Sequence, residues 1–459
     1  MLATQLAHLL DEPAGIAEVL EVIAGFDDAL VHGFARIGDE QAAALAALAG
    51  AVAGSPLAGP VAAAVAELST GSIGPEKLAA LAAARAALLG AVHDALAGQF
   101  DTTLGRPRSE WAQADSSTVA PGNLVAGCRS WLQELAISGW RGVDHDLVAA
   151  VDQTVEALWG DPALRRLAVL LDGFAAELSA SCPVATMDRV PVKRWADLWA
   201  RALLLSWRGD ETRAAATISG RLLILGVDVH EHGTAVQAQV YGVLEGSDGV
   251  NRRVRVSVSA AKVDTIVGPA VWQVLGAHPQ LLKALADHRS LDVTDLPLTA
   301  NGDLLWHDDR AGLGSPADPF ATARIQLATA TGPAVPPLDR DPVHLAEPVL
   351  LEGYRVKEGA LELDGHRLVL ELDRLPGCGP LTPSSLTGSA ACLGLLRWDA
   401  GQWTLRPLAV QKKVKNVVTE IHGGDWACGP TDPKVVKALA KSGDSVAVLR
   451  ERAGRLLRK

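Results

Sequence analysis

The stretch of residues 190–261 constrains the fold most, because its hydrophobic period changes there from that of a helix to that of a strand. Trp195, Trp199 and Ala202 recur at intervals of four and three residues, which places them on one face of a helix. Pro191 suits the first turn of that helix, where a missing N–H costs nothing. The spacing therefore predicts an amphipathic helix over residues 190–207.

Three runs with strand-like composition or alternation follow this helix, separated by short turns that contain glycine. They cover residues 221–229, 234–244 and 251–259. Period-2 alternation between glycine turns is typical of hairpins, so these runs predict a three-stranded antiparallel meander. A sheet with one apolar face needs a cover. We expect the tryptophan helix to provide it, with a second candidate helix over residues 269–288.

The rest of the chain predicts an α+β, multidomain protein with an alanine-rich helical N-terminal half and an antiparallel β-rich C-terminal half. At 459 residues, two to four domains are expected. All 12 tryptophans lie between Trp111 and Trp426, and this change in core composition indicates a boundary at residues 103–108. The expected helices before residue 190 cover residues 3–10, 16–36, 40–53, 60–68, 75–96, 124–138, 146–159 and 161–179.

Five regions result from this division. They are a helical domain (1–105), a second helical region (106–215), the meander plus a helix (216–290), a proline-rich loop or linker (291–345), and a β-hairpin domain with C-terminal helices (346–459). Within the loop, residues 324–330 have the composition of a single strand.

Composition and motifs exclude several classes of protein. A net charge of −11 argues against a surface built as a whole to bind nucleic acid, and the stretch 41–66 is broken by prolines into halves too short to cross a membrane. The N-terminus lacks a basic segment before Asp11, and the five cysteines are scattered, so we expect a cytoplasmic protein. Nucleotide-binding and hydrolase-elbow motifs are absent, and we expect no cofactor.

Two polar segments are candidates for a catalytic site. His307 and Asp308 lie in the long loop, where they could act as an acid/base pair. His422 and Asp425 lie beside glycines near the C-terminus. A polar loop and a turn with a buried Trp426 explain the same residues without chemistry.

A third segment offers metal ligands. Asp228, His230 and His232 would share one face of a strand and could bind an ion together. The segment also lies at a predicted hairpin tip, where polar residues need no other role than solubility, and no distant fourth ligand is identifiable.

Two basic segments are candidates for a nucleic-acid surface. Arg253 and Arg255 share one face of the third meander strand, and Lys412 and Lys413 follow a late hairpin. A small curved sheet with exposed arginines would resemble an oligonucleotide-binding barrel. That face lacks the aromatic residues that stack on bases, so a solvated strand face is the preferred interpretation.

The segment Val-Lys-Arg-Trp-Ala-Asp-Leu-Trp-Ala-Arg-Ala-Leu-Leu-Leu, residues 192–205, resembles segments of uncharacterised proteins from alanine-rich bacteria. Some of these are encoded beside MoxR-type AAA+ ATPases and von Willebrand A proteins. The resemblance covers one helix and implies an accessory role in an ATPase-driven assembly, with other proteins as partners. It implies no site residues.

Three functions remain open on the sequence. The first, which we prefer, is a non-catalytic scaffold or adaptor that binds other proteins, a MoxR-type ATPase among them. The second is a nucleic-acid-binding module that uses the arginine strand. The third is an enzyme, such as a metal-dependent hydrolase, whose site is assembled from His307, Asp308, His422 and Asp425.

Overall fold

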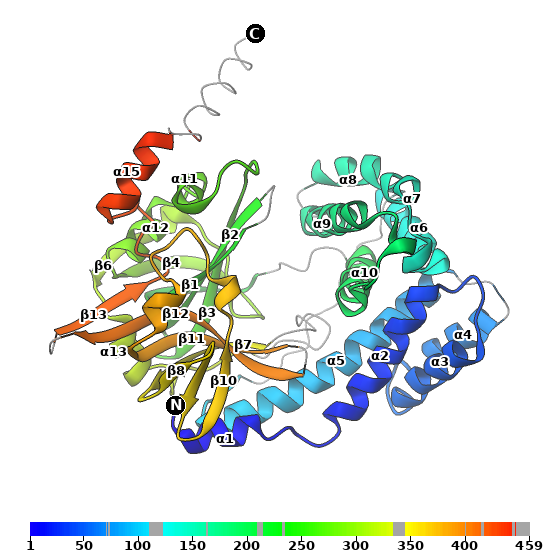
Figure 1. Ribbon diagram of the computed structural model, residues 1–459, viewed down its shortest axis with the longest axis horizontal. Helices are drawn as coiled ribbons and strands as arrows, with labels where there is room; N and C mark the ends of the chain where they lie inside the picture. The colour runs from blue at the N-terminus through cyan, green and yellow to red at the C-terminus, as the bar shows by residue number, and fades with distance from the viewer. Residues whose placement is uncertain are drawn as a thin grey trace, which may run out of the picture.

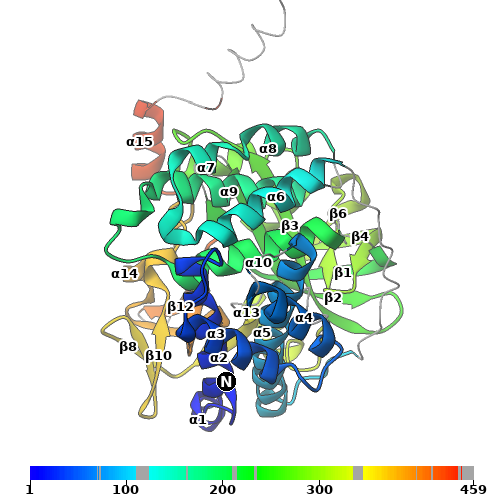
Figure 2. The ribbon, with the colours of Figure 1, turned by 90° about the vertical axis from the view of Figure 1, so that its right-hand side faces the viewer.

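The chain folds into a helical region followed by two mixed, mostly antiparallel β-sheets (Figure 1). This computed structural model describes residues 1–69, 71, 74–109, 123–161, 164–208, 214–231, 235–333, 345–399, 401–414, 417–442 and 446. In Figure 2 the helical region lies in front of the sheets, so the molecule has an α side and a β side. The α+β, multidomain prediction is confirmed.

Ten α-helices are described before the first strand. They are α1 (Ala3–Leu10), α2 (Ile16–His32), α3 (Asp39–Ala51), α4 (Ala58–Ser69), α5 (Pro75–Leu104), α6 (Asn123–Ser138), α7 (His145–Ala149), α8 (Asp152–Trp159), α9 (Arg165–Ser181) and α10 (Val192–Arg208). One hydrophobic cluster joins members of α2 to α10, so the two predicted helical regions share a core. The uncharged stretch 41–66 forms parts of two short helices, α3 and α4, as its prolines predict.

The tryptophan helix α10 lies in this helical core. Trp195 and Trp199 are fully buried, and the Trp199 Nε1 donates a hydrogen bond to the Leu132 carbonyl at 2.8 Å. The ring of Trp140 meets Trp195 edge to face, with centroids 5.9 Å apart. The expectation that α10 covers the meander is therefore wrong: its apolar face packs on other helices, which bury it more completely than one sheet face would.

A buried ion triad joins three of these helices. Arg85 of α5 is fully buried, and its guanidinium donates to both carboxylate oxygens of Asp27 of α2, at 2.5 and 2.8 Å. It also donates to Asp197 of α10. The two carboxylates pair the buried guanidinium, and the three side chains together fix how the helices align.

The first sheet closes on itself as a small barrel. Its strands are β1 (Ala214–Glu231), β2 (Ala235–Gly246), β3 (Asn251–Ala261), β4 (Arg289–Thr299), β5 (Asp303–Leu304) and β6 (Ala311–Pro316). The pairing order is β1-β2-β3-β5-β4-β6, and β1 also pairs with β4, which closes a ring of five strands. The predicted meander is β1 to β3, paired antiparallel as expected.

Short helices between β3 and β4 pack against the barrel. They are α11 (Val271–Val274) and α12 (Pro279–Ala286), and their buried residues Trp272, Leu281 and Leu285 join the barrel's hydrophobic cluster. The predicted cover over residues 269–288 is thus confirmed, in the form of two short helices. Five strands in this order, with β3 parallel to β5 and a helix before β4, have the connectivity of an oligonucleotide/oligosaccharide-binding barrel.

The second sheet holds the described strands after residue 344. They are β7 (Leu345–Glu352), β8 (Arg355–Lys357), β9 (Ala360–Leu363), β10 (His366–Leu370), β11 (Ser389–Asp399), β12 (Gln402–Val414) and β13 (Val417–His422). The order is β7-β11-β12-β10-β9-β8. Strand β12 pairs on one side with β11, and on the other with β10 near its start and β13 near its end. Helices α14 (Pro383–Leu386) and α15 (Pro433–Ser442) complete this part.

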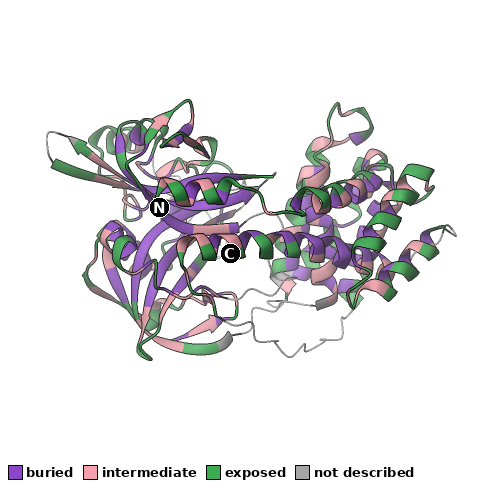
Figure 3. Cartoon of the chain, turned by 90° about the horizontal axis from the view of Figure 1, so that it is seen from below, coloured by how far each residue is buried: buried purple, intermediate pink, exposed green. Residues whose placement is uncertain are grey.

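The two sheets pack face to face, with a glycine at one point of close approach. A Cβ added to Gly226 of β1 would lie 2.8 Å from the Leu408 Cβ of β12. Tyr241, Leu395 and Leu408 form a buried cluster between the sheets. Figure 3 shows the central parts of the strands buried. Because β11 and β12 lie against β1 and β2, the second sheet covers part of the barrel's outer face.

Helix α5 connects the α side to the β side. Its first half, with Leu78 and Leu81, belongs to the helical core, and its second half, with Leu96 and Phe100, packs with α1 on the second sheet. By length and composition α5 could also cross a membrane, and half of its apolar window is buried within this fold.

The prediction of a loop or linker over residues 291–345 is wrong for the residues that the structure describes. That part contains most of β4, all of β5 and β6, and α13 (Pro319–Ile325), and residues 324–330 do not form a strand. Most of the outward-facing positions of β4 hold polar residues or proline, so the composition of the strand resembles that of a loop. Its partners β1 and β6 supply the pairing that local sequence does not indicate.

We expect Trp199→Ala to lower the free energy of unfolding by about 3–5 kcal/mol, because it removes a fully buried indole and leaves a cavity. Urea unfolding followed by circular dichroism measures this loss. Val169→Ala, at a position 51% exposed on the neighbouring helix α9, is the control and should change stability by less than about 0.5 kcal/mol. A Trp199→Ala protein as stable as the control would contradict the burial of this face.

We expect Gly226→Ala to cost about 1–3 kcal/mol, because the new methyl group would press on Leu408 and separate the sheets. Adding Leu408→Gly, which removes the Leu408 Cβ that the new methyl group would meet, should relieve the clash, so the two losses should not add in a double-mutant cycle. Gly312→Ala on β6, where a Cβ meets nothing within 4 Å, is the control. Additive losses at Gly226 and Leu408 would show that the sheets do not meet there.

Candidate functional site

Two histidines and two carboxylates from distant parts of the chain meet where the barrel touches the second sheet. His288 lies between α12 and β4, with a left-handed backbone (φ 48°). Glu420 and His422 are two residues apart on β13 and therefore share a face of that strand. Asp425 lies in the turn that follows β13. We call these four residues the histidine cluster.

Hydrogen bonds hold the histidine cluster together. His288 Nε2 lies 2.8 Å from Asp425 Oδ1, and His422 Nε2 lies 3.0 Å from Glu420 Oε2. The other oxygen of Asp425 accepts from the His422 backbone N–H at 3.0 Å. The two imidazole centroids are only 4.2 Å apart. Each histidine thus has a carboxylate partner, and the two pairs lie side by side.

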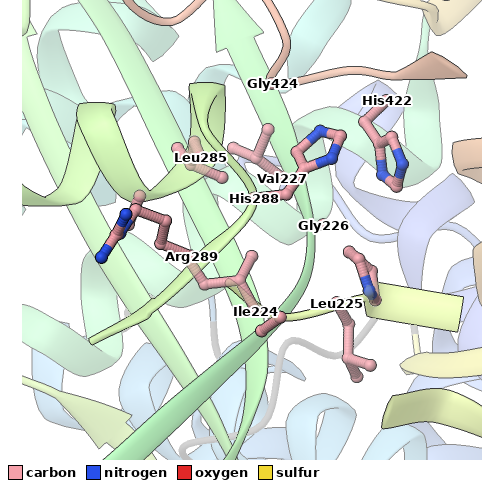
Figure 4. Close-up of a pocket in the computed structure, with 12 residues that line it drawn as sticks. Ile224, Leu225, Gly226, Val227, Leu285, His288, Arg289, His422 and Gly424 are labelled. Carbon is pink, nitrogen blue, oxygen red and sulfur yellow. The ribbon is translucent and has the colours of Figure 1, made fainter. Parts of the chain in front are cut away.

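A small cavity adjoins the two imidazoles. Its volume is about 20 Å³, and its lining includes Gly226, Leu285, Pro319, His288 and His422 (Figure 4). The close-up shows the rings of His288 and His422 next to each other at this cavity. This cavity has room for a water molecule or an ion.

The charges in the histidine cluster shift two pKa values. The hydrogen bond to Asp425, with the charges of Asp425 and Glu420, raises the pKa of His288 above its ordinary value although burial opposes this. The hydrogen bond with His422 lowers the pKa of Glu420. The site is therefore arranged to favour positive charge beside ionised carboxylates.

Three residues of the cluster could hold a metal ion. One ligand atom from each of His288, Glu420 and His422 lies within 4.8 Å of the other two. Asp425 orients His288 and the backbone at His422.

The structure brings together only half of the predicted catalytic residues. His422 and Asp425 share the histidine cluster. Asp308 instead accepts hydrogen bonds from the Gln280 backbone N–H, at 3.2 Å, at the start of α12. His307 is exposed beside it. Within the described chain, no hydrogen bond or ion pair joins His307 or Asp308 to the histidine cluster, so the four residues do not form one site.

Sequence reasoning missed His288 and Glu420. The Glu420–His422 spacing is a usable signal, because residues two apart share a face of a strand, but residues 417–422 were not recognised as a strand. His288 lies more than 130 residues away, at the end of a predicted helix, and no local pattern connects it to β13.

Two of the predicted metal ligands take part in an ion network between the sheets. Asp228 is buried, His230 Nε2 lies 3.1 Å from one of its carboxylate oxygens, and an Arg406 nitrogen lies 2.6 Å from the other. Arg406 and Arg397 both approach Glu371. Asp228 and His230 do share a face, as predicted, but the carboxylate is paired with arginine. His232 lies outside the described residues.

The predicted nucleic-acid contacts of β3 are occupied by carboxylates. Arg255 forms a two-point hydrogen bond with Asp303, at 2.6 and 3.0 Å. Arg253 is buried, donates to the Ala330 carbonyl at 2.7 Å and lies 3.6 Å from Glu347. Paired guanidinium groups are less available for phosphates than free ones.

The two lysines of β12 differ from each other. Lys412 donates to the carbonyls of Ser384 and Thr387 at the end of α14, at 3.0 and 3.1 Å. Lys413 is exposed. One lysine therefore anchors a helix end, and the other faces solvent beside β13.

Glu347 is the centre of a cluster of charged residues that also contains Asp101, Arg108 and Arg253. We call these four residues the arginine cluster. Arg108 donates to Glu347 at 3.1 Å and to both oxygens of Asp101 at the end of α5. Burial alone would raise the pKa of Glu347, but the charges of Arg253 and Arg108 outweigh it and hold that pKa below its ordinary value.

We expect Glu347→Ala to lower the free energy of unfolding by roughly 3 kcal/mol at neutral pH, because two largely buried guanidinium groups lose a carboxylate. Since the folded pKa is depressed, this contribution is complete above the unfolded pKa of about 4.5 and is lost as pH falls through the lower folded value. Urea unfolding at pH 7 and at lower pH measures both effects.

Glu352→Ala is the matched control, because its ion pair with Arg324 is largely exposed and should contribute at most about 1 kcal/mol. Equal losses from the two variants at pH 7 would show that Glu347 has no special role.

No protein-family model matches this chain, and no curated protein matches its sequence.

Proposed function

We propose that this protein is a non-catalytic scaffold that binds a partner protein through the outer part of strand β13. The observation that supports the proposal is an apolar sheet edge. Val417 and Val418 are 64% and 57% exposed at the start of β13. In the described part of the chain, β12 is the one strand that pairs with β13.

A free edge presents unpaired backbone N–H and C=O groups to any extended chain that meets it. Soluble proteins usually protect such edges with charged side chains or cover them. Here the first two edge residues are valines, which favour strand pairing. An added strand would satisfy the backbone groups and bury both side chains.

The hairpin of β12 and β13 projects from the body of the β side (Figure 1). A chain of hydrogen bonds holds its base: Arg324 donates to Gln411, and Gln411 donates to Glu420 at 2.7 Å. Glu420 in turn meets His422 in the histidine cluster. The exposed edge is therefore presented in a fixed orientation, which lowers the entropic cost of binding.

The chemistry of the edge indicates the kind of partner. Val418 lies opposite Lys413 in the β12–β13 register, and Lys413 is exposed. An extended segment with apolar, β-branched residues and a neighbouring carboxylate would complement both. The resemblance of residues 192–205 makes a MoxR-type AAA+ ATPase the first partner to test.

The test is affinity purification of the tagged protein from its native host, followed by reconstitution with the purified partner. We expect the double variant Val417→Lys/Val418→Lys to weaken that complex at least tenfold, because two added lysines oppose strand pairing at an edge. Hydrogen exchange should also show that the partner protects the amides of β13.

Ile325→Lys is the matched control: Ile325 is an exposed apolar residue, 73% accessible, on α13 rather than on the hairpin. It should bind the partner as the wild type does. A wild-type protein that purifies without a stoichiometric protein partner, or a complex that the double variant leaves unchanged, would refute the proposal.

A further inference from the structure

We propose that the histidine cluster binds one divalent transition-metal ion, of which Zn²⁺ is the type, through His288, Glu420 and His422. This inference goes beyond protein binding and does not depend on it. The argument starts from the meeting of two imidazoles and a carboxylate from opposite sides of a contact between two sheets.

The distances fit one ion. In a tetrahedral site, metal–ligand bonds of about 2.0–2.2 Å place the ligand atoms about 3.3–3.6 Å apart. The three ligand atoms lie within 4.8 Å of one another, so side-chain movements of up to about 1 Å would bring them into coordination. The adjoining cavity of about 20 Å³ leaves room for a water molecule as a further ligand.

The donor types select the class of ion. Imidazole nitrogen suits Zn²⁺, Ni²⁺, Co²⁺ and Fe²⁺, whereas Mg²⁺ and Ca²⁺ prefer sites built from oxygen. Two histidines with one carboxylate therefore favour a first-row transition metal.

The surrounding residues act as supports for such a site. Asp425 is hydrogen-bonded to His288. Glu420 contacts His422 through Oε2, and its other oxygen, Oε1, accepts a hydrogen bond from Gln411 at 2.7 Å. The ring of Phe320 packs edge to face on His422, with centroids 5.7 Å apart. Outer partners of this kind fix the orientation of metal ligands, and their loss weakens binding about 10–100-fold.

The local charge also suits a cation. Glu420 and Asp425 both contact the imidazoles, and Asp318 adds negative charge near His288. The nearby guanidinium of Arg289 donates to the Gly314 carbonyl at 2.9 Å. A divalent ion would replace the protons now shared between imidazole and carboxylate, and would join the start of β4 to the base of the β13 hairpin.

The test is calorimetric titration of the chelator-treated full chain with ZnCl₂, supported by the visible spectrum of the Co²⁺-loaded protein. We expect one ion per chain, and absorption bands typical of Co²⁺ bound by nitrogen and oxygen ligands. His288→Gln and Glu420→Gln should each weaken Zn²⁺ binding by more than about 100-fold, and Asp425→Asn by about 10–100-fold.

The control is His307→Gln, which changes an exposed histidine outside the histidine cluster and should bind Zn²⁺ as the wild type does. His288 and Glu420 are partly exposed, so their variants should remain folded, and circular dichroism checks this. Absence of stoichiometric Zn²⁺ binding by the wild type, or unchanged binding by a folded His288→Gln protein, would overturn the inference. Retained Zn²⁺ binding by the Val417→Lys/Val418→Lys variant is expected, which keeps this result separate from partner binding.

Discussion

The arrangement of the α side on the β side depends on the arginine cluster around Glu347. Asp101 ends α5, Arg108 follows it, Arg253 belongs to the barrel, and Glu347 belongs to the second sheet. Carboxylates and guanidinium groups from the last turn of α5 and the residues after it, the barrel and the second sheet thus satisfy one another at a single place. A buried charge without a partner is costly, so these elements stabilise one another's positions.

The barrel shows why a familiar connectivity does not determine a function. Its strand order is that of barrels that bind oligonucleotides or oligosaccharides, yet β11 and β12 of the same chain cover part of the face formed by β1 and β2. The arginines of β3, which local sequence presents as a basic stripe, are paired with Asp303 and Glu347. This part of the barrel surface is therefore packed against the second sheet.

Local periodicity predicted most of the helices and the meander, because each of these depends on residues close in sequence. It failed where stability comes from distant partners. Strand β4 alternates from Leu291 to Thr294 but loses this pattern at Asp295, and β1 and β6 hold it in the sheet. Helix α10 was assigned to the wrong neighbour because a helical stripe does not specify what covers it. At the candidate site, His422 and Asp425 were recognised as polar residues beside glycines, whereas His288 reaches them only through the packing of two sheets.

Helix α5 contributes residues to two hydrophobic cores, so the stability of each core depends on the other. It is 30 residues long, so at a rise of about 1.5 Å per residue it extends roughly 45 Å. Its first half lines one core and its second half the other, and helix formation is cooperative along the chain. Loss of one core would release one end of this helix and weaken the packing at its other end. The α side and the second sheet are thereby coupled as one cooperative unit, in which damage to either is transmitted along a single element.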